Sequence, residues 1–240
     1  PGPKLRGSLN ETTALSLDAF LRDVETVGFA IAGQTADLDP ADKKLYALRD
    51  VTGTVPAIPL IVSSIMSKKL AAGADVIVLD VKCGSGAFME TEAQARELGT
   101  EMVEIGKLAG KKTVACITDM DEPLGCAVGN ALEVREAMDV LKGRFGGNLL
   151  ELCLTLGGCI LTESGVSPDM DAARAALQRG IADGSALRKL AEFVHAQGGD
   201  ERAVYDDTLL PQEPVKLEPT CKPAGYVTHI AAADVGEGSM

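Results

Sequence analysis

The sequence predicts an α/β protein with a central mixed or mostly parallel sheet flanked by helices. Two apolar runs of strand length, residues 74–81 (ADVIVLDV) and 113–118 (TVACIT), enclose a segment of helical length, residues 92–109. A strand, a helix and a strand in this order predict a parallel crossover. The first run is largely apolar, which is typical of a strand buried on both faces of a parallel sheet. Hydrophobic residues make up 46% of the chain, so a core of sufficient size can form.

Three helices and one short strand are expected before residue 74. Ser16 is a typical N-cap, and it precedes apolar residues at helical spacing: Leu17, Phe20, Leu21, Val24 and Val27. The short apolar run 29–32 (FAIA) predicts a buried strand. A second helix should begin at the cap and proline of residues 39–40 and end near residue 53. The third should begin at Pro59 and stop at residue 73, because residues that precede a proline disfavour the helical conformation.

After the first strand, helices alternate with glycine-rich loops. The loops are residues 82–88 (KCGSGAF) and 124–130 (LGCAVGN), and a ligand-binding loop at the end of a central strand is a common feature of α/β sheets. Helices are expected at residues 131–141, 149–162, 170–183 and 186–196. Four prolines make residues 206–223 an extended linker, and residues 224–233 (AGYVTHIAAA) predict a further strand.

Composition excludes several classes of function. The net charge of −12 argues against nucleic-acid binding, because phosphate backbones require clustered Lys and Arg. The six cysteines form no CxxC pair, and no signal peptide or long uncharged apolar run is visible. We therefore expect a cytoplasmic protein that does not bind a membrane. His195 and His229 belong to no known catalytic motif and are interpreted as surface or packing residues.

Residues 46–70 combine an apolar helix with three polar functions, Arg49, Ser64 and Lys68. Ser64 and Lys68 are four residues apart, so they lie on one face of the helix that begins at Pro59. Ile61 and Ile65 form a neighbouring apolar pair. The pattern alone fits a pocket of basic and hydroxyl groups, and it fits equally well an amphipathic helix with a solvated lysine end.

Three segments carry a resemblance to a known family: PADKKLYALRDVTGTV, PLIVSSIMSKKLAAGADVIVLDVKCGSGAFM and PLGCAVGNALEVREA. Together they resemble the thymidine phosphorylase and pyrimidine-nucleoside phosphorylase family. The resemblance implies reversible phosphorolysis, in which a pyrimidine nucleoside (uridine, thymidine or deoxyuridine) and phosphate give the free base and a pentose 1-phosphate. Phosphate would be the co-substrate, and no organic cofactor is implied.

The resemblance also implies roles for individual residues. The family's base-binding residues match Arg49, Ser64 and Lys68, of which Arg49 and Lys68 would be catalytic. The apolar wall of its base pocket matches four residues: Val55, Ile61, Ile65 and Phe88. The family's potassium ion would be held by the backbone oxygens of Leu124 and Ala127 and by the carboxylate of Glu136.

The resemblance predicts a division into domains. Residues 1–43 and 73–210 would belong to an incomplete α/β domain, and residues 44–72 to a helical domain that binds the base and forms a homodimer in the complete protein. A linker, 211–223, would lead to the start of a C-terminal α+β domain at 224–240. Lys4 and Leu5 align with the end of a phosphate-binding motif, so the phosphate half of the site is expected ahead of Pro1 and the chain alone is expected to be inactive.

Three alternatives remain open at this point. One is a phosphorylase specific for thymidine. Another is phosphoribosyl transfer, although no acidic metal-binding pair stands beside the glycine loop at 84–86. The third is a module that holds a pyrimidine or a partner chain without turnover.

Overall fold

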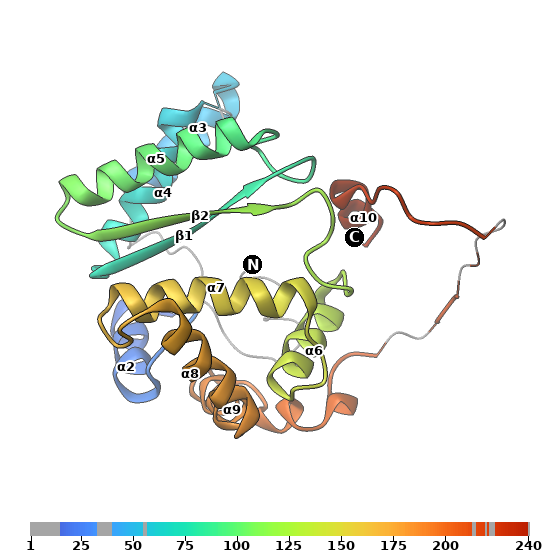
Figure 1. The fold of residues 1–240 in the computed structure, drawn as a ribbon. Helices are drawn as coiled ribbons and strands as arrows, with labels where there is room; N and C mark the ends of the chain where they lie inside the picture. Colours follow the sequence, from blue (N-terminus) through green and yellow to red (C-terminus); the bar gives the residue numbers. More distant parts are fainter. Residues whose placement is uncertain are drawn as a thin grey trace.

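A computed structural model describes residues 15–32, 40–54, 57–212, 215–218, 220 and 224–239. Its centre is a pair of parallel strands, β1 (Val76–Cys83) and β2 (Lys112–Asp119). Figure 1 shows helices on both faces of this pair, with α3 (Pro40–Thr52), α4 (Ile58–Ala71) and α5 (Glu92–Leu108) on one side and α7 (Gly147–Glu163) on the other. The predicted class is confirmed, with a parallel crossover through α5.

The remaining helices pack beyond α7 or follow it in the chain. They are α2 (Leu17–Val27), α6 (Asn130–Leu141), α8 (Met170–Ala182) and α9 (Ser185–Ala196), followed by two 3₁₀ turns, Glu201–Val204 and Asp207–Leu209, and by α10 (Ala232–Gly238). The helices expected between residues 16 and 196 are all confirmed to within two residues at each described end. In α2 the expected cap is present, because the Ser16 hydroxyl accepts the Ala19 N–H at 3.2 Å. Asp39 lies outside the described residues. Among the described residues, no helix is both long and apolar enough to cross a membrane.

The two faces of β1 differ, which corrects the expectation of a strand buried on both. Ile77, Leu79 and Val81 are buried on the face toward α4 and α5, whereas Asp80 lies exposed on the other face. The strand also continues through Lys82 and Cys83, residues that the sequence placed in the following loop. Alternation along a strand sends neighbouring side chains to opposite faces, so a single apolar run can still carry charge on one of them.

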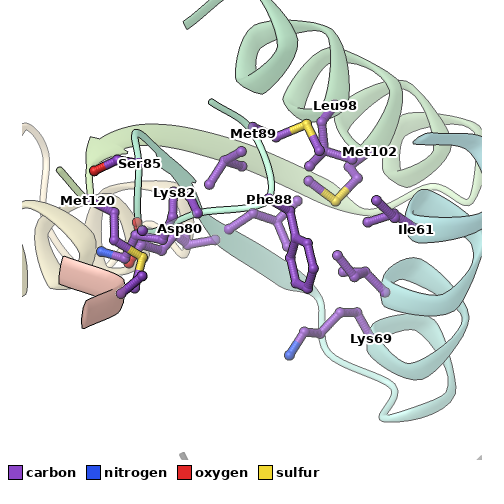
Figure 2. A pocket seen from close by; sticks show the side chains of 17 residues that line it. Ile61, Lys69, Asp80, Lys82, Ser85, Phe88, Met89, Leu98, Met102 and Met120 are labelled. Carbon is purple, nitrogen blue, oxygen red and sulfur yellow. The ribbon is translucent and has the colours of Figure 1, made fainter. Parts of the chain in front are cut away.

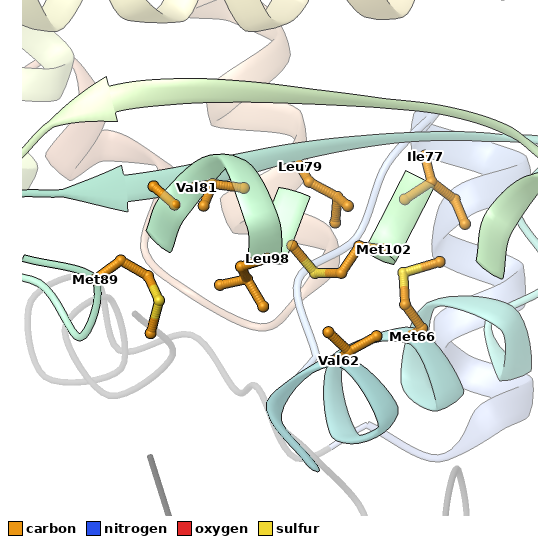
Figure 3. Close-up of a cluster of buried hydrophobic side chains, with 9 residues drawn as sticks. Val62, Met66, Ile77, Leu79, Val81, Met89, Leu98 and Met102 are labelled. Atoms are coloured by element: carbon orange, nitrogen blue, oxygen red, sulfur yellow. The ribbon is translucent and has the colours of Figure 1, made fainter. Parts of the chain in front are cut away.

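The core on the α4 side combines branched aliphatic side chains with methionines. Figure 3 shows Val62 and Met66 of α4 and Leu98 and Met102 of α5 meeting beneath β1. Helix α5 approaches β2 so closely that a Cβ at Gly106 would lie 1.9 Å from Oγ1 of Thr113. Only glycine fits at this position, and it fixes the distance between α5 and the sheet.

A second core cluster lies between α2, α6 and α9. Phe193 is at its centre and stacks on Phe29 with ring centroids 4.5 Å apart. The strand expected at residues 29–32 is absent from this described segment. Instead, the side-chain amide of Gln197 accepts the Ile31 N–H at 2.8 Å and donates to the Ile31 carbonyl at 2.9 Å. One glutamine thus satisfies both backbone groups that a neighbouring strand would have paired.

The strand expected at residues 224–233 is also wrong. Residues 224–231 form neither strand nor helix, and α10 begins at Ala232. The start of this helix contacts the loop after β2, since the Ala232 N–H donates to the Asp121 carbonyl at 3.3 Å. A β-like run without a neighbouring strand gains no ladder of hydrogen bonds, so its composition alone does not make it a strand.

Candidate functional site

Helix α4 carries four of the predicted site residues, and they lie on two adjacent faces of the helix. One face presents Ser64 and Lys68 toward α3, and the neighbouring face presents Ile61 and Ile65 toward the sheet. Pro59 occupies the second position of α4, so the helix begins at Ile58, one residue earlier than expected. The four-residue spacing predicted that Ser64 and Lys68 lie on one face of this helix. The structure adds that the two faces of α4 line two different cavities.

The first cavity, here called the polar cavity, lies between α3 and α4 and has a volume of about 150 Å³. It is lined by polar groups of both helices and by leucines: Asp42, Arg49, Thr52, Thr54, Ser63, Ser64, Leu45, Leu48 and Leu60. Arg49 is only 7% exposed, and its Nη1 donates to the Leu60 carbonyl at 3.1 Å. Arg49 and Ser64 therefore line the same cavity.

Lys68 lies at the border of the polar cavity, where it forms an ion pair with Asp42. Its Nζ is 3.0 Å from Oδ2 of Asp42, a side chain that is 6% exposed and lines the cavity. Sequence reasoning did not select Asp42, because an acidic residue in the first turn of a helix is already explained by the helix dipole. Val55, which the resemblance placed in the pocket wall, lies outside the described residues.

The second cavity, here called the apolar cavity, has a volume of about 930 Å³ and opens between α4, the sheet and the first glycine-rich loop. Ile61, Ile65 and Phe88 all line it, so three of the four predicted wall residues share one space. Phe88 is 80% exposed, and Figure 2 shows its ring projecting from the loop toward α4. Of the two adjacent lysines, Lys69 lines the apolar cavity and Lys68 faces Asp42.

The first glycine-rich loop is held against the loop that follows β2. Oδ1 of Asp121 accepts the Ser85 N–H at 2.7 Å, and this hydrogen bond is the main reason that the pKa of Asp121 is lowered. A Cβ at Gly84 would meet the Asp121 N at 2.8 Å, and one at Gly86 would meet the Met120 carbonyl oxygen at 2.7 Å. The glycines are therefore required for this close approach of two backbones, which sequence pattern alone could not separate from a simple tight turn.

A polar network joins the two strands at the point where both loops begin. Nζ of Lys82 lies 2.7 Å from Oδ2 of Asp80 and donates to Oγ1 of Thr118 at 3.1 Å, while the Thr118 hydroxyl donates to Asp80. Lys82 lines both the apolar cavity and a third cavity beside it. Sequence reasoning missed this network, although two charges in an otherwise apolar strand were a visible signal.

The third cavity, of about 430 Å³, contains the predicted cation ligands. Leu124, Ala127 and Glu136 all line it. The Glu136 carboxylate accepts the N–H groups of Cys126 at 2.7 Å and Ala127 at 3.3 Å, which folds the 124–130 loop around it. The Glu136 carboxylate therefore has a structural role in the loop, and a carboxylate is a ligand type that hard cations prefer.

The fold and these cavities define an α/β domain with a cleft at the carboxyl ends of its strands. The model of a glycosyl transferase family, in its a/b domain, matches residues 8–187, and the chain belongs to this family. It is 50% identical over 237 residues to the pyrimidine-nucleoside phosphorylase of Bacillus subtilis (strain 168), which covers 99% of this chain and 55% of the relative. It is 51% identical over 221 residues to the pyrimidine-nucleoside phosphorylase of Staphylococcus aureus (strain USA300), which covers 92% of this chain and 51% of that relative. The chain thus spans about half the length of the curated relatives it matches.

Proposed function

We propose that this chain forms the base-binding side of a pyrimidine-nucleoside phosphorylase. The reaction would be the reversible phosphorolysis of uridine, thymidine or deoxyuridine to the free base and a pentose 1-phosphate. The observation that supports it most directly is the polar cavity, where Arg49 and Ser64 meet and the Asp42–Lys68 pair lies at the border. The names of the two relatives support the same reaction.

The chemistry of the reaction explains these residue types. As the glycosidic bond breaks, negative charge grows on the leaving pyrimidine and positive charge on the sugar. Cationic donors from Arg49 and Lys68 on the ring carbonyls would stabilise that negative charge more in the transition state than in the ground state. The Ser64 hydroxyl can donate or accept, so it suits a ring nitrogen whose protonation changes during the reaction.

The other parts of the proposal concern binding and assembly. Ile61, Ile65 and Phe88, which line the apolar cavity on the adjacent face of α4, would form the apolar wall on that side of the site, and the resemblance adds Val55. Backbone oxygens of Leu124 and Ala127 and the Glu136 carboxylate would hold a potassium ion. The protein would act as a cytoplasmic homodimer, with residues 44–72 in the helical dimer domain. Apolar side chains exposed on α3 support the last point: Leu45, Leu48 and Val51.

The test compares the two adjacent lysines. An extended enzyme joins this chain to the regions of the Bacillus subtilis relative that it does not span. In that enzyme Lys68→Ala should lower kcat/KM for uridine by about 10²-fold, the scale for loss of a charged transition-state donor. Lys69→Ala is the comparison and should have a clearly smaller effect, because Lys69 lines the apolar cavity whereas Lys68 is paired with Asp42 at the polar cavity. The unextended chain should release no base at a comparable rate.

Two results would contradict the proposal. Equal losses in the two lysine variants would indicate general attraction by positive charge instead of a directed contact from Lys68. An extended enzyme that binds uracil but releases no base from uridine or thymidine would instead favour a binding module. Both measurements use saturating phosphate, with the free base followed by chromatography.

A further inference from the structure

Asp42 is the one acidic side chain among the described residues that line the polar cavity. It comes from the first turn of α3, and Lys68 comes from the last turn of α4. The N-terminus of α3 lies beside the C-terminus of α4. The helix dipole favours the negative charge of Asp42 at the first and the positive charge of Lys68 at the second. Their 3.0 Å ion pair therefore joins the two helices at the edge of the cavity.

The burial of this pair separates it from ordinary surface ion pairs. The Asp42 side chain is 6% exposed and that of Lys68 is 28% exposed. Most other ion pairs of the described chain are more open, such as Arg96 with Glu92, where both side chains are at least 67% exposed. A carboxylate withdrawn from water is costly unless it is held by charge and hydrogen bonds, so the position of Lys68 is tightly constrained by Asp42.

We propose that Asp42 is a positioning residue for pyrimidine recognition: its buried carboxylate holds the Lys68 ammonium at the mouth of the polar cavity. The inference rests on the proposed function, in which Lys68 contacts the base. An ammonium has three N–H donors, so an ion pair to Asp42 leaves donors for a ring carbonyl. Asp42 also lines the cavity together with Arg49, and its negative charge offsets the repulsion between two cations that serve one small ligand.

The experiment is a double-mutant cycle in the extended enzyme. Asp42→Asn keeps the size of the side chain and removes its charge, and it should lower kcat/KM for uridine about tenfold. The loss should be in kcat, with KM for phosphate unchanged, because Lys68 acts on charge that develops in the transition state. In the Lys68→Ala background the same Asp42→Asn change should alter kcat/KM by less than about twofold, since Asp42 acts through Lys68. Asp42→Glu keeps the charge and should retain more activity than Asp42→Asn.

The matched control is Asp23, which is as buried as Asp42 but lies on α2, with Arg22 Nε at 3.9 Å. Asp23→Asn should leave kcat unchanged and show no coupling to Lys68→Ala. Losses that multiply in the double variant would overturn the inference, as would an Asp42→Asn enzyme as active as Asp23→Asn. Should Asp42→Asn fail to fold, Asp42→Ser, which also removes the charge, takes its place in the cycle and is judged by the same coupling. An inactive parent enzyme, or a harmless Lys68→Ala, would refute the proposed function itself.

Discussion

Gln197 offers a quantitative test of how the helical half of the molecule is held together. Its side chain is 2% exposed and makes two hydrogen bonds to the backbone of Ile31, 166 residues earlier. Gln197→Met keeps the length of the side chain and removes both hydrogen bonds. Each bond contributes about 1 kcal/mol, and leaving the half-buried Ile31 groups without these partners adds a further penalty, so we expect a loss of about 3 kcal/mol. For a protein of this size, that corresponds to a fall in Tm of roughly 6–12 °C.

The control uses another glutamine whose side chain makes two hydrogen bonds to the backbone. The exposed Gln212 side chain donates to the Asp207 carbonyl at 3.0 Å and to the Leu210 carbonyl at 2.9 Å, both within five residues. Gln212→Met should change stability by less than about 0.5 kcal/mol, because water replaces its bonds. Thermal unfolding followed by circular dichroism compares the two. A Tm of Gln197→Met within about 2 °C of the parent, or equal to that of Gln212→Met, would refute the structural role given to Gln197.

Three further predictions concern other parts of the fold. Gly106→Ala should destabilise the protein by about 1–3 kcal/mol in a thermal melt, because the new methyl group would overlap Thr113 at the contact between α5 and β2; a neutral effect would contradict that contact. Glu136→Gln in the extended enzyme should reduce the rise of Tm with added potassium, whereas a Tm that ignores potassium in both proteins would reject the cation site. The lowered pKa of Asp121 means that its stabilising effect is present above the pKa of the unfolded state and is lost as pH falls through the folded value. Stability should therefore depend less on pH in the acid range in Asp121→Asn, and an unchanged acid profile would argue against the bond to Ser85.

Local patterns predicted most of the helices, because caps, prolines and 3.6-residue spacing act within a few residues. Ser16 and Thr91 both cap helices as such rules require. The same rules predicted that Ser64 and Lys68 share a face of α4. The sequence resembles the phosphorylase family, and the family match places the chain in the glycosyl transferase family.

Local patterns gave wrong predictions where the hydrogen-bonding partner of a segment lies far away in the sequence. The run at residues 29–32 has the composition of a strand, but a glutamine far along the chain supplies its partner. The Asp42–Lys68 pair was hidden for a related reason, since each residue is explained within its own helix. Neither contact leaves a periodic signal, so only the three-dimensional arrangement reveals it.

The network of Asp80, Lys82 and Thr118 has a consequence for loop exchange between relatives. It joins the last residues of β1 and β2, from which both glycine-rich loops depart, and Asp121 binds the first loop from the second. The two loops therefore form a single unit for transplantation. A chimera that takes one loop from a relative and keeps the other would mismatch their shared contacts, whereas moving residues 80–89 and 118–130 together would preserve them.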